Sequence, residues 1–300
     1  MSLLVTGSIA IDSVTSPYGH AEEVLGGSAV YFSFAASYYV PVRLVGVVGE
    51  DFPSGFRKVL CAREIDLAGL EVRPGSRTFR WTGRFEGDMS QAQTVEVDLN
   101  VLAEKGPVVP ESFADSKVVF LANTHPTLQR ELLSQLRQPR LVVCDTMDLW
   151  ITTEKDSLIE TLGCVEGVII NDGEARQLTQ RMNLVEAADA IRDFGPSFVV
   201  IKKGEHGVLM VGPDGTVALP AHPSRNVRDP TGAGDSFAGG FLGFVCSRGN
   251  MDHDTLREGL VRGTVAASFT IEDFSLRRIE RLSRDELEDR VQGYTKMLRF

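Results

Sequence analysis

The sequence has 300 residues, of which 43% are hydrophobic and 24% charged, and its formal net charge is −10. This composition supports a globular core, and an acidic balance without a basic run excludes a nucleic-acid-binding surface. No apolar stretch approaches the ~18 residues that cross a bilayer, and residues 3–5 open the chain without a basic leader, so we expect a soluble cytoplasmic protein with no membrane or nucleic-acid partner.

Strand-like and helical stretches alternate along most of the chain. The predicted strands, in chain order, are 3–9, 43–48, 118–121, 141–144, 167–170 and 198–201. The predicted helices are 29–39, 54–64, 128–136, 154–162, 184–194, 235–247, 254–270 and 284–297. Because the strands are nearly continuous apolar runs separated by helices, the pattern indicates a mostly parallel sheet covered on both faces.

The segment 77–99 interrupts this alternation with a period of two residues. One face of a strand there would carry the aromatic side chains Phe79, Trp81 and Phe85. The other face would carry Thr78, Arg80, Thr82 and Arg84. The pattern predicts a small antiparallel sheet, with further strands from segment 12–24. Such a sheet would act as a lid over a substrate, or would be a plain structural excursion or a dimer patch.

The segment 229–242, Asp-Pro-Thr-Gly-Ala-Gly-Asp-Ser-Phe-Ala-Gly-Gly-Phe-Leu, places small residues directly before an apolar helical run. Free N–H groups at a helix start, with the positive end of the helix dipole, bind anions. The negative charge of a carboxylate at Asp235 would repel a phosphate. Its presence makes sense if the carboxylate receives the proton of a hydroxyl that attacks the phosphate. The segment therefore suggests phosphoryl transfer to a hydroxyl, although an acidic first turn is also ordinary helix capping.

The same run resembles the C-terminal signature of the ribokinase-like (PfkB) carbohydrate kinases. The resemblance extends from Gly7 to about Phe274, with its motifs in the expected order. It implies one kinase domain over 1–300, an α/β fold with a three-layer α/β/α sandwich, a mostly parallel central sheet and a small β lid, built mainly from 77–99 and in part from 12–24. It also implies an ATP-dependent kinase that transfers the γ-phosphoryl group to a hydroxyl of a sugar or sugar-like small molecule.

The resemblance also assigns roles to individual residues. The implied general base is Asp235. The implied anion hole consists of the backbone amides of residues 232–235, that is, Gly232, Ala233, Gly234 and Asp235 itself. The implied acceptor-binding residues are Asp12, Gly26, Gly27 and Tyr31. Many relatives carry Asn where this chain has Tyr31, which argues against ribose itself in the usual pose. Taken alone, Asp12 would be an ordinary turn residue.

Nucleotide and metal contacts follow from the same resemblance. The implied ATP-binding residues are Asn171, Lys202, Gly204, Thr231, Gly232 and Gly234. Asn171 and Glu174 match an Asn-x-x-Glu motif associated with Mg²⁺, which prefers hard oxygen ligands. Taken alone, these two residues would form a helix capping box, and Lys202 would be a solvated lysine. Relatives often use K⁺, and Asp229 and Thr231 are consistent with a K⁺ site. Phe274, however, stands where relatives often have glycine, which argues against K⁺ dependence.

Other interpretations of the acceptor stay open. A nucleoside kinase, similar to adenosine kinase, would use Tyr31, Phe79 and Trp81 as an aromatic platform for the base. An anionic acceptor would use Arg80 and Arg84, and each of these side chains could instead serve packing or solvation alone. A catalytically silent sugar or nucleotide sensor is disfavoured because it has no need of a general base. A homodimer through the lid is consistent with the family.

The remaining candidates have simpler interpretations. The cysteines lie far apart in apolar segments, so we expect reduced core residues and neither a disulfide framework nor a zinc site, at Cys61, Cys144, Cys164 and Cys246. His125, Asp145 and Asp148 follow predicted strands, and we expect polar caps and turns at these positions.

Overall fold

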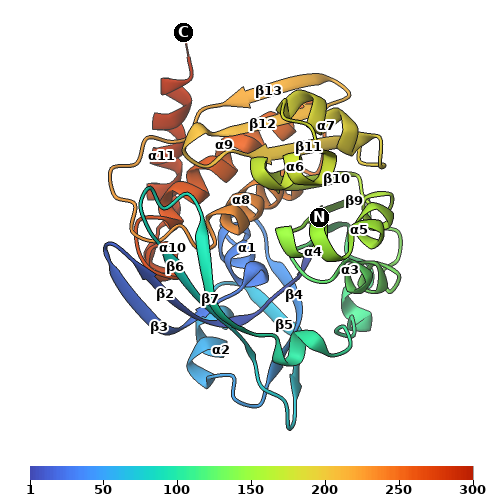
Figure 1. Ribbon diagram of the computed structural model, residues 1–300, viewed down its shortest axis with the longest axis vertical. Helices are drawn as coiled ribbons and strands as arrows, with labels where there is room; N and C mark the ends of the chain where they lie inside the picture. Colours follow the sequence, from blue (N-terminus) through green and yellow to red (C-terminus); the bar gives the residue numbers. More distant parts are fainter. Residues whose placement is uncertain (300) are drawn as a thin grey trace.

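The computed structural model describes residues 1–299 and has three layers, with a nine-stranded sheet between two layers of helices (Figure 1). In spatial order its strands are β13 (Gly215–Leu219), β12 (Val208–Gly212), β11 (Phe198–Lys202), β10 (Gly167–Asn171), β9 (Leu141–Asp145), β8 (Val118–Leu121), β1 (Leu3–Thr6), β4 (Val42–Gly49) and β5 (Ile65–Arg73). All neighbours from β11 to β5 pair in parallel, and β12 and β13 pair antiparallel at one edge. This confirms the predicted three-layer α/β/α fold with a mostly parallel sheet.

Alternate side chains of the buried strands enter two separate cores, one on each face of this sheet. Leu3 and Val5 of β1 enter the first core, and Leu4 enters the second. The helices with buried residues in the first core are α1 (Ser28–Ala36), α2 (Ser54–Cys61), α8 (Ala233–Arg248), α9 (His253–Thr270), α10 (Arg277–Arg281) and α11 (Arg284–Met297). Those of the second core are α3 (Pro126–Leu133), α4 (Asp148–Thr153), α5 (Lys155–Leu162), α6 (Asp172–Thr179) and α7 (Leu184–Arg192). Single 3-10 turns lie at η1 (Asn100–Ala103), η2 (Glu111–Phe113) and η3 (Gly204–His206).

A second sheet, here called the small sheet, lies to one side of this body. Its four strands, in spatial order, are β3 (Gly19–Gly26), β2 (Ala10–Ser16), β6 (Phe79–Phe85) and β7 (Ala92–Asp98). Both outer pairs are antiparallel, but β2 and β6 run parallel, with Asp12 opposite Trp81 and Val14 opposite Gly83. Residues that pair across a sheet share a face, so Trp81 lies on the same face as Asp12.

The face of the small sheet that carries Val14 packs on the body through Phe274, which follows α9. Its apolar cluster joins Val14, Ala21, Phe85 and Met89 to Phe274. Arg80 and Thr82 alternate with Trp81 and Gly83 along β6, so their side chains lie on the opposite face. The predicted separation of aromatic and polar side chains on β6 therefore holds.

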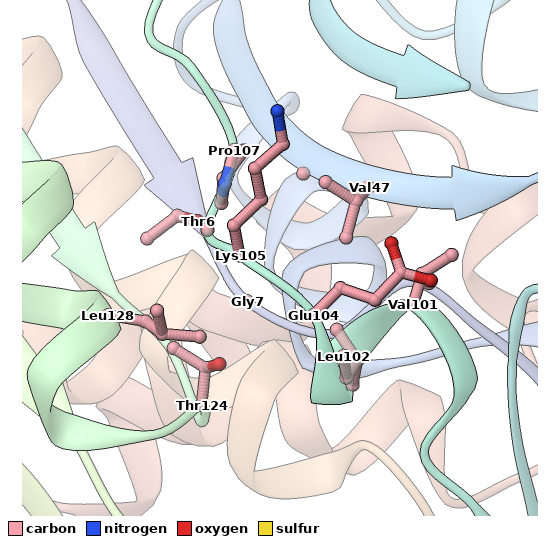
Figure 2. Close-up of a pocket in the computed structure, with 12 residues that line it drawn as sticks. Thr6, Gly7, Val47, Val101, Leu102, Glu104, Lys105, Pro107, Thr124 and Leu128 are labelled. Carbon is pink, nitrogen blue, oxygen red and sulfur yellow. The ribbon is translucent and has the colours of Figure 1, made fainter. Parts of the chain in front are cut away.

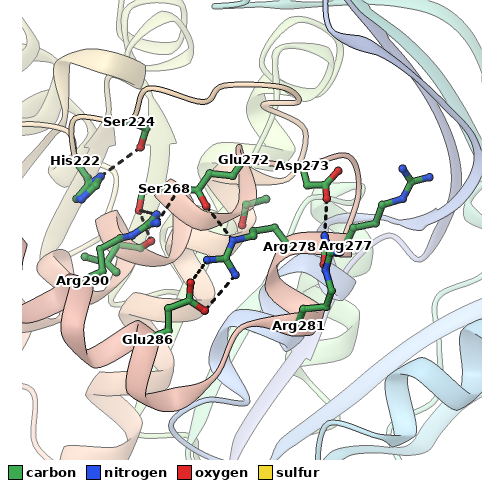
Figure 3. Close-up of polar contacts among 12 residues, drawn as sticks. His222, Ser224, Ser268, Glu272, Asp273, Arg277, Arg278, Arg281, Glu286 and Arg290 are labelled. Atoms are coloured by element: carbon green, nitrogen blue, oxygen red, sulfur yellow. Dashed lines mark hydrogen bonds and ion pairs between the residues drawn. The ribbon is translucent and has the colours of Figure 1, made fainter.

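An ion-pair cluster fixes the segment around Phe274 (Figure 3). Glu272 accepts from Arg278 at 3.0 Å and pairs with Arg290 of α11 at 2.8 Å. The Arg290 guanidinium also stacks on the Phe269 ring, 3.4 Å from its centre. The end of α9 is therefore held by α10 and α11, which fixes the segment against which the small sheet docks.

Within residues 1–299, no helix is both long and apolar enough to cross a membrane.

Candidate active site

The turn before α8 has the geometry expected of an anion-binding helix start. Gly232 adopts a left-handed conformation, with φ 73° and ψ 3°, and no side chain caps the helix. The N–H group of Ala233 donates to Pro230 O at 3.1 Å. Among the described residues, the N–H groups of Gly234 and Asp235 have no backbone acceptor, so these two amides of the turn are available to a ligand.

The ammonium group of Lys202 lies beside these free amides. A Cβ atom at Gly234 would stand 2.8 Å from the Lys202 Nζ atom, so the absence of a side chain at Gly234 makes room for the ammonium. Lys202 ends β11 and pairs with Asn171 at the end of β10. Its Nζ atom lies 4.0 Å from Asp145 Oδ2, and the two side chains are 20% and 6% exposed. Lys202, predicted only as an ATP contact, thus lies beside the turn that opens α8.

Three carboxyl groups surround this lysine, and burial raises the pKa of each. The pKa of Asp145 lies well above its usual range because of burial, opposed by Lys202 and reinforced by the charges of Asp235 and Glu174. Burial raises the pKa of Glu174 to about 7, again opposed by Lys202. Burial also raises the pKa of Asp235, again opposed by Lys202.

Asn171 and Glu174 form the capping box of α6. The Glu174 N–H group donates to Asn171 Oδ1 at 2.8 Å, and the Asn171 N–H group donates to Glu174 Oε2 at 2.8 Å. This confirms the structural interpretation of the pair and leaves Glu174 Oε1 for another ligand. In the described part of the chain, no group of three or more His, Cys, Asp or Glu side chains is placed to hold a metal by itself.

The residues expected to bind the acceptor form a close-packed unit where β2 and β3 meet the start of α1. A Cβ atom at Gly26 would lie 1.8 Å from Asp12 Oδ2, and one at Gly27, where φ is 99°, would lie 2.4 Å from Ser8 O. The Asp12 side chain is buried and accepts from the Gly27 N–H group. Burial raises the pKa of Asp12 to about 8, and the nearby charges of Asp229 and Asp235 raise it further.

Tyr31 lies under the turn rather than in an open pocket. It is 2% exposed, and a Cβ atom at Gly232 would lie 2.3 Å from its ring. Both oxygens of the neighbouring Asp229 are engaged: Oδ1 accepts from Thr231 N–H at 2.9 Å and Oδ2 from Ser275 N–H at 3.2 Å. Tyr31 thus joins the acceptor motif to the turn of α8. The buried hydroxyl of Thr231 has no partner.

The small sheet presents different chemistry on its two faces. Trp81 and Phe79, both half-buried, lie on the face that carries Asp12. Arg80 lies on the opposite face, where it donates to Glu23 at 2.8 Å and lies 3.5 Å from Asp51. An anionic acceptor held by Arg80 and Arg84 therefore finds no support, since both side chains are on the face away from Asp12.

Of the three strand-end residues expected to be caps or turns, only His125 caps a helix with its side chain. His125 caps α3 by accepting from Thr127 N–H at 3.2 Å, and Asp148 lies in the first turn of α4. Asp145 instead ends β9 inside the site, buried and beside Lys202. An acidic residue that closes an apolar strand next to β10, which carries Asn171, is the signal that would have found it. Gly204 opens the exposed 3-10 turn after β11.

A hollow near the ends of β1 and β4 is separate from these groups (Figure 2). It is lined by Thr6, Gly7, Val47, Thr124 and Leu128 together with the loop around Lys105. None of the carboxyl groups described above lines it.

Comparison with known proteins agrees with this arrangement. The family model described as pfkB family carbohydrate kinase matches residues 3–280. A cytidine kinase from Thermococcus kodakarensis is 33% identical over 270 residues, which cover 87% of this chain and 94% of the relative. An inositol 3-kinase from Arabidopsis thaliana is 22% identical over 306 residues, covering 98% of this chain and 80% of the relative.

Among solved structures, a Burkholderia thailandensis nucleoside kinase in complex with inosine aligns with a TM-score of 0.80 at 18% identity, over 97% of each chain. This likeness confirms the ribokinase-like fold. The chain therefore belongs to the pfkB family of carbohydrate kinases and is a phosphotransferase that moves the γ-phosphoryl group of ATP to a hydroxyl of a sugar or sugar-like small molecule.

Proposed function

We propose that the acceptor is a nucleoside, phosphorylated on a hydroxyl of its sugar. The observation that carries this proposal is the pairing of Trp81 with Asp12 on one face of the small sheet. A half-buried indole offers a flat apolar surface for a base, and the adjacent carboxyl group accepts hydrogen bonds from sugar hydroxyls. Because Tyr31 is buried, Phe79 and Trp81 are the remaining members of the expected aromatic platform.

The relatives support this choice over a free sugar. The 33% identical relative is a cytidine kinase, and the structural neighbour was solved with inosine. The inositol kinase is more distant, at 22% identity. A nucleoside combines the sugar hydroxyls that the family phosphorylates with the base that an aromatic wall favours.

The catalytic step follows from the groups around the start of α8. The acceptor oxygen attacks the γ-phosphorus, its proton passes to a carboxylate oxygen of Asp235, and the bond from the γ-phosphorus to the bridging oxygen breaks to release ADP. The free amides of Gly234 and Asp235 stabilise the moving phosphoryl group, aided by the helix dipole. Gly232 shapes the turn that aims these amides, and Ala233 is fixed to Pro230. Asp12 and the turn at Gly26 and Gly27 orient the acceptor.

ATP would lie along the ends of β10 and β11. We assign its phosphates to Lys202 and the turn around Thr231, and its remaining contacts to Asn171 and Gly204. Mg²⁺ is commonly held by one or two carboxylates, waters and substrate phosphates, which fits Glu174 with its free oxygen and the absence of a larger cage in residues 1–299. When bound, Mg²⁺ neutralises phosphate charge. K⁺ dependence, the homodimer and the cytoplasmic location stay predictions.

The test is a coupled ADP-release assay with Mg-ATP against nucleosides, free pentoses and hexoses, inositols and sugar phosphates. We expect turnover with nucleosides, and in Trp81→Ala a rise of about 5- to 150-fold in KM for the nucleoside, the range for loss of one aromatic stack on a base. Arg84→Ala, on the same strand but the other face, should leave KM unchanged. Turnover with free sugars alone, or an unchanged KM in Trp81→Ala, would overturn the nucleoside assignment.

The same assay tests the general base. Asp235→Asn should keep the fold and lose about 10²-fold or more in kcat, the scale for a removed acid–base group. Turnover close to wild type in this variant would remove Asp235 from the mechanism.

A further inference from the structure

Asp145 has no role in the chemistry described so far, yet it is one of the most constrained side chains near the anion hole. It ends β9, and its side chain is 6% exposed. The Gln129 amide donates to the backbone oxygens of Leu121, Ala122 and Asp145 at 2.9, 3.1 and 3.1 Å. The ends of β8 and β9 are thereby tied together, which fixes the backbone from which the Asp145 carboxyl group projects.

The cation close to this carboxyl group comes from two strands away. Lys202 ends β11, β10 lies between β11 and β9, and the lysine side chain brings Nζ within 4.0 Å of Asp145 Oδ2. The second oxygen, Asp145 Oδ1, is buried and has no hydrogen-bond partner among residues 1–299. Ionising a carboxyl group in such surroundings is costly unless a cation stays near it.

The ammonium group is held loosely enough to serve another partner. A separation of 4.0 Å is longer than a direct N–H···O hydrogen bond between charged groups, about 2.7 to 2.9 Å. On its other side the ammonium borders Gly234, whose N–H group is free. Lys202 therefore lies between a fixed carboxyl group and the position proposed for the transferred phosphoryl group.

We propose that Lys202 is a catalytic residue that contacts the phosphoryl group during transfer, and that Asp145 is a positioning residue that holds its ammonium over the Gly234 amide. The inference rests on the proposed phosphoryl-transfer role of the α8 turn, and it does not depend on which acceptor is used. The lysine side chain is flexible and charged, so its ammonium group can stay in contact with the phosphoryl group during transfer. Asp145 defines the position to which the ammonium group returns afterwards.

The test is a double-mutant cycle on kcat with Asp145→Asn, Lys202→Met and the double variant. Lys202→Met should lower kcat about 10²-fold, as for one lost donor to developing charge. Asp145→Asn should lower it about tenfold or more, as for a misplaced group, with KM for the acceptor within about twofold. Because Asp145 acts through Lys202, the double variant should be no slower than Lys202→Met. Lys203→Met, one residue along the chain, is the matched control and should match wild type.

A second readout does not use turnover. In wild type, acetic anhydride should label Lys202 slowly, and AMP-PNP should protect it more than ADP does. In Asp145→Asn, labelling should be faster, with Lys203 labelling in the same peptide as the internal reference. Circular dichroism melting confirms that each variant is folded.

Additive losses in the cycle, or equal labelling in wild type and Asp145→Asn, would overturn the pairing. A loss in Asp145→Asn that disappears at high Mg²⁺ would also overturn it, since the carboxylate would then act through the metal. If wild type phosphorylates a free sugar, the nucleoside proposal fails, but the cycle can still be run on that sugar. If no acceptor is turned over, the labelling comparison alone decides.

Discussion

The ring of Tyr31 packs directly against Gly232, and a Cβ atom on that glycine would lie 2.3 Å from the ring. The Tyr31 hydroxyl is buried near Ser275, and burial raises its pKa well above the ordinary value. Gly232 needs its left-handed φ of 73° to open α8, and a residue with a side chain would be strained there in addition to meeting the ring. The start of α1, proposed to bind the acceptor, and the turn of α8, proposed to bind the phosphoryl group, are therefore one packed unit.

This packing predicts a contrast between two substitutions of Tyr31. Tyr31→Phe keeps the ring under Gly232, so kcat and KM for the acceptor should stay within about twofold of wild type. Tyr31→Ala removes the support, and both kcat and the free energy of unfolding should fall, the latter by about 3 to 5 kcal/mol as for other large buried rings. Steady-state kinetics and urea unfolding measure both. A tenfold higher acceptor KM in Tyr31→Phe would instead show that the hydroxyl binds the acceptor.

A methyl group at Gly234 should displace the Lys202 ammonium while leaving the backbone amides in place. The atom that a Cβ would meet most closely is Lys202 Nζ, at 2.8 Å, the far end of a flexible side chain. Gly234→Ala should therefore fold at least as stably as wild type, because alanine favours helix, but lose about tenfold or more in kcat. Gly293→Ala in α11, where a Cβ meets open space, is the control. A Gly234→Ala enzyme with normal kcat would contradict the position given to Lys202.

Asp12 should make stability depend on pH. With a folded-state pKa of about 8, the carboxyl group keeps its proton in the folded protein, whereas the unfolded chain ionises near pH 4. Its contribution to stability is thus fully present below about pH 4 and is lost as the pH rises through about 8. Asp12→Asn has no carboxyl group to ionise, so it lacks this loss. The difference in free energy of unfolding between Asp12→Asn and wild type should therefore be about a few kcal/mol larger in favour of the variant at pH 9 than at pH 4. Acceptor binding should be weakened in the variant.

Urea unfolding at several pH values measures this difference. Asp98→Asn, an exposed acid on β7, should follow the wild-type pH dependence. Parallel curves for wild type and Asp12→Asn would show that Asp12 does not hold a proton in the folded protein.

Phe274 should control how firmly the small sheet is docked. Its ring joins the apolar cluster of that sheet and lies against Gly19. In Phe274→Ala, amides of β2 and β6 should exchange hydrogen faster, those of α7 should not, and acceptor KM should rise. Phe56→Ala on α2, which packs on the body instead, is the control for general destabilisation. Unchanged exchange in β2 would mean that the docking rests on other contacts.

The parallel sheet was predictable because its central strands are buried on both faces and read as continuous apolar runs. The β12–β13 hairpin was not predicted, since three of the five residues of β13 are exposed and the strand is short. Strand β5 was not predicted either, because polar residues interrupt it and it lacks the continuous apolar run by which the central strands were recognised. Helix α6 was missed as an element although its capping box was recognised, because Gly173 and several polar residues weaken its apolar pattern.

The candidate site was predictable where chemistry is local and not where it depends on distance. The turn at 232–235 can be recognised from adjacent residues alone. The approach of Lys202 to Asp145 joins strands that are not neighbours in the sheet, so spacing in the sequence gives no sign of it. The burial of Tyr31 likewise comes from packing between α1 and the turn of α8, which residue type alone does not specify.

The docking of the small sheet has a consequence for synthesis, which proceeds from the N-terminus. The segments 10–26 and 79–98 emerge from the ribosome well before Phe274, the residue on which they dock. The pairing of β2 with β6 must also close over the intervening β3, α1, β4, α2 and β5, at an entropic cost that grows with loop length. The aromatic face therefore stays uncovered until the last part of the chain has been made. Chaperones would bind this face during that interval.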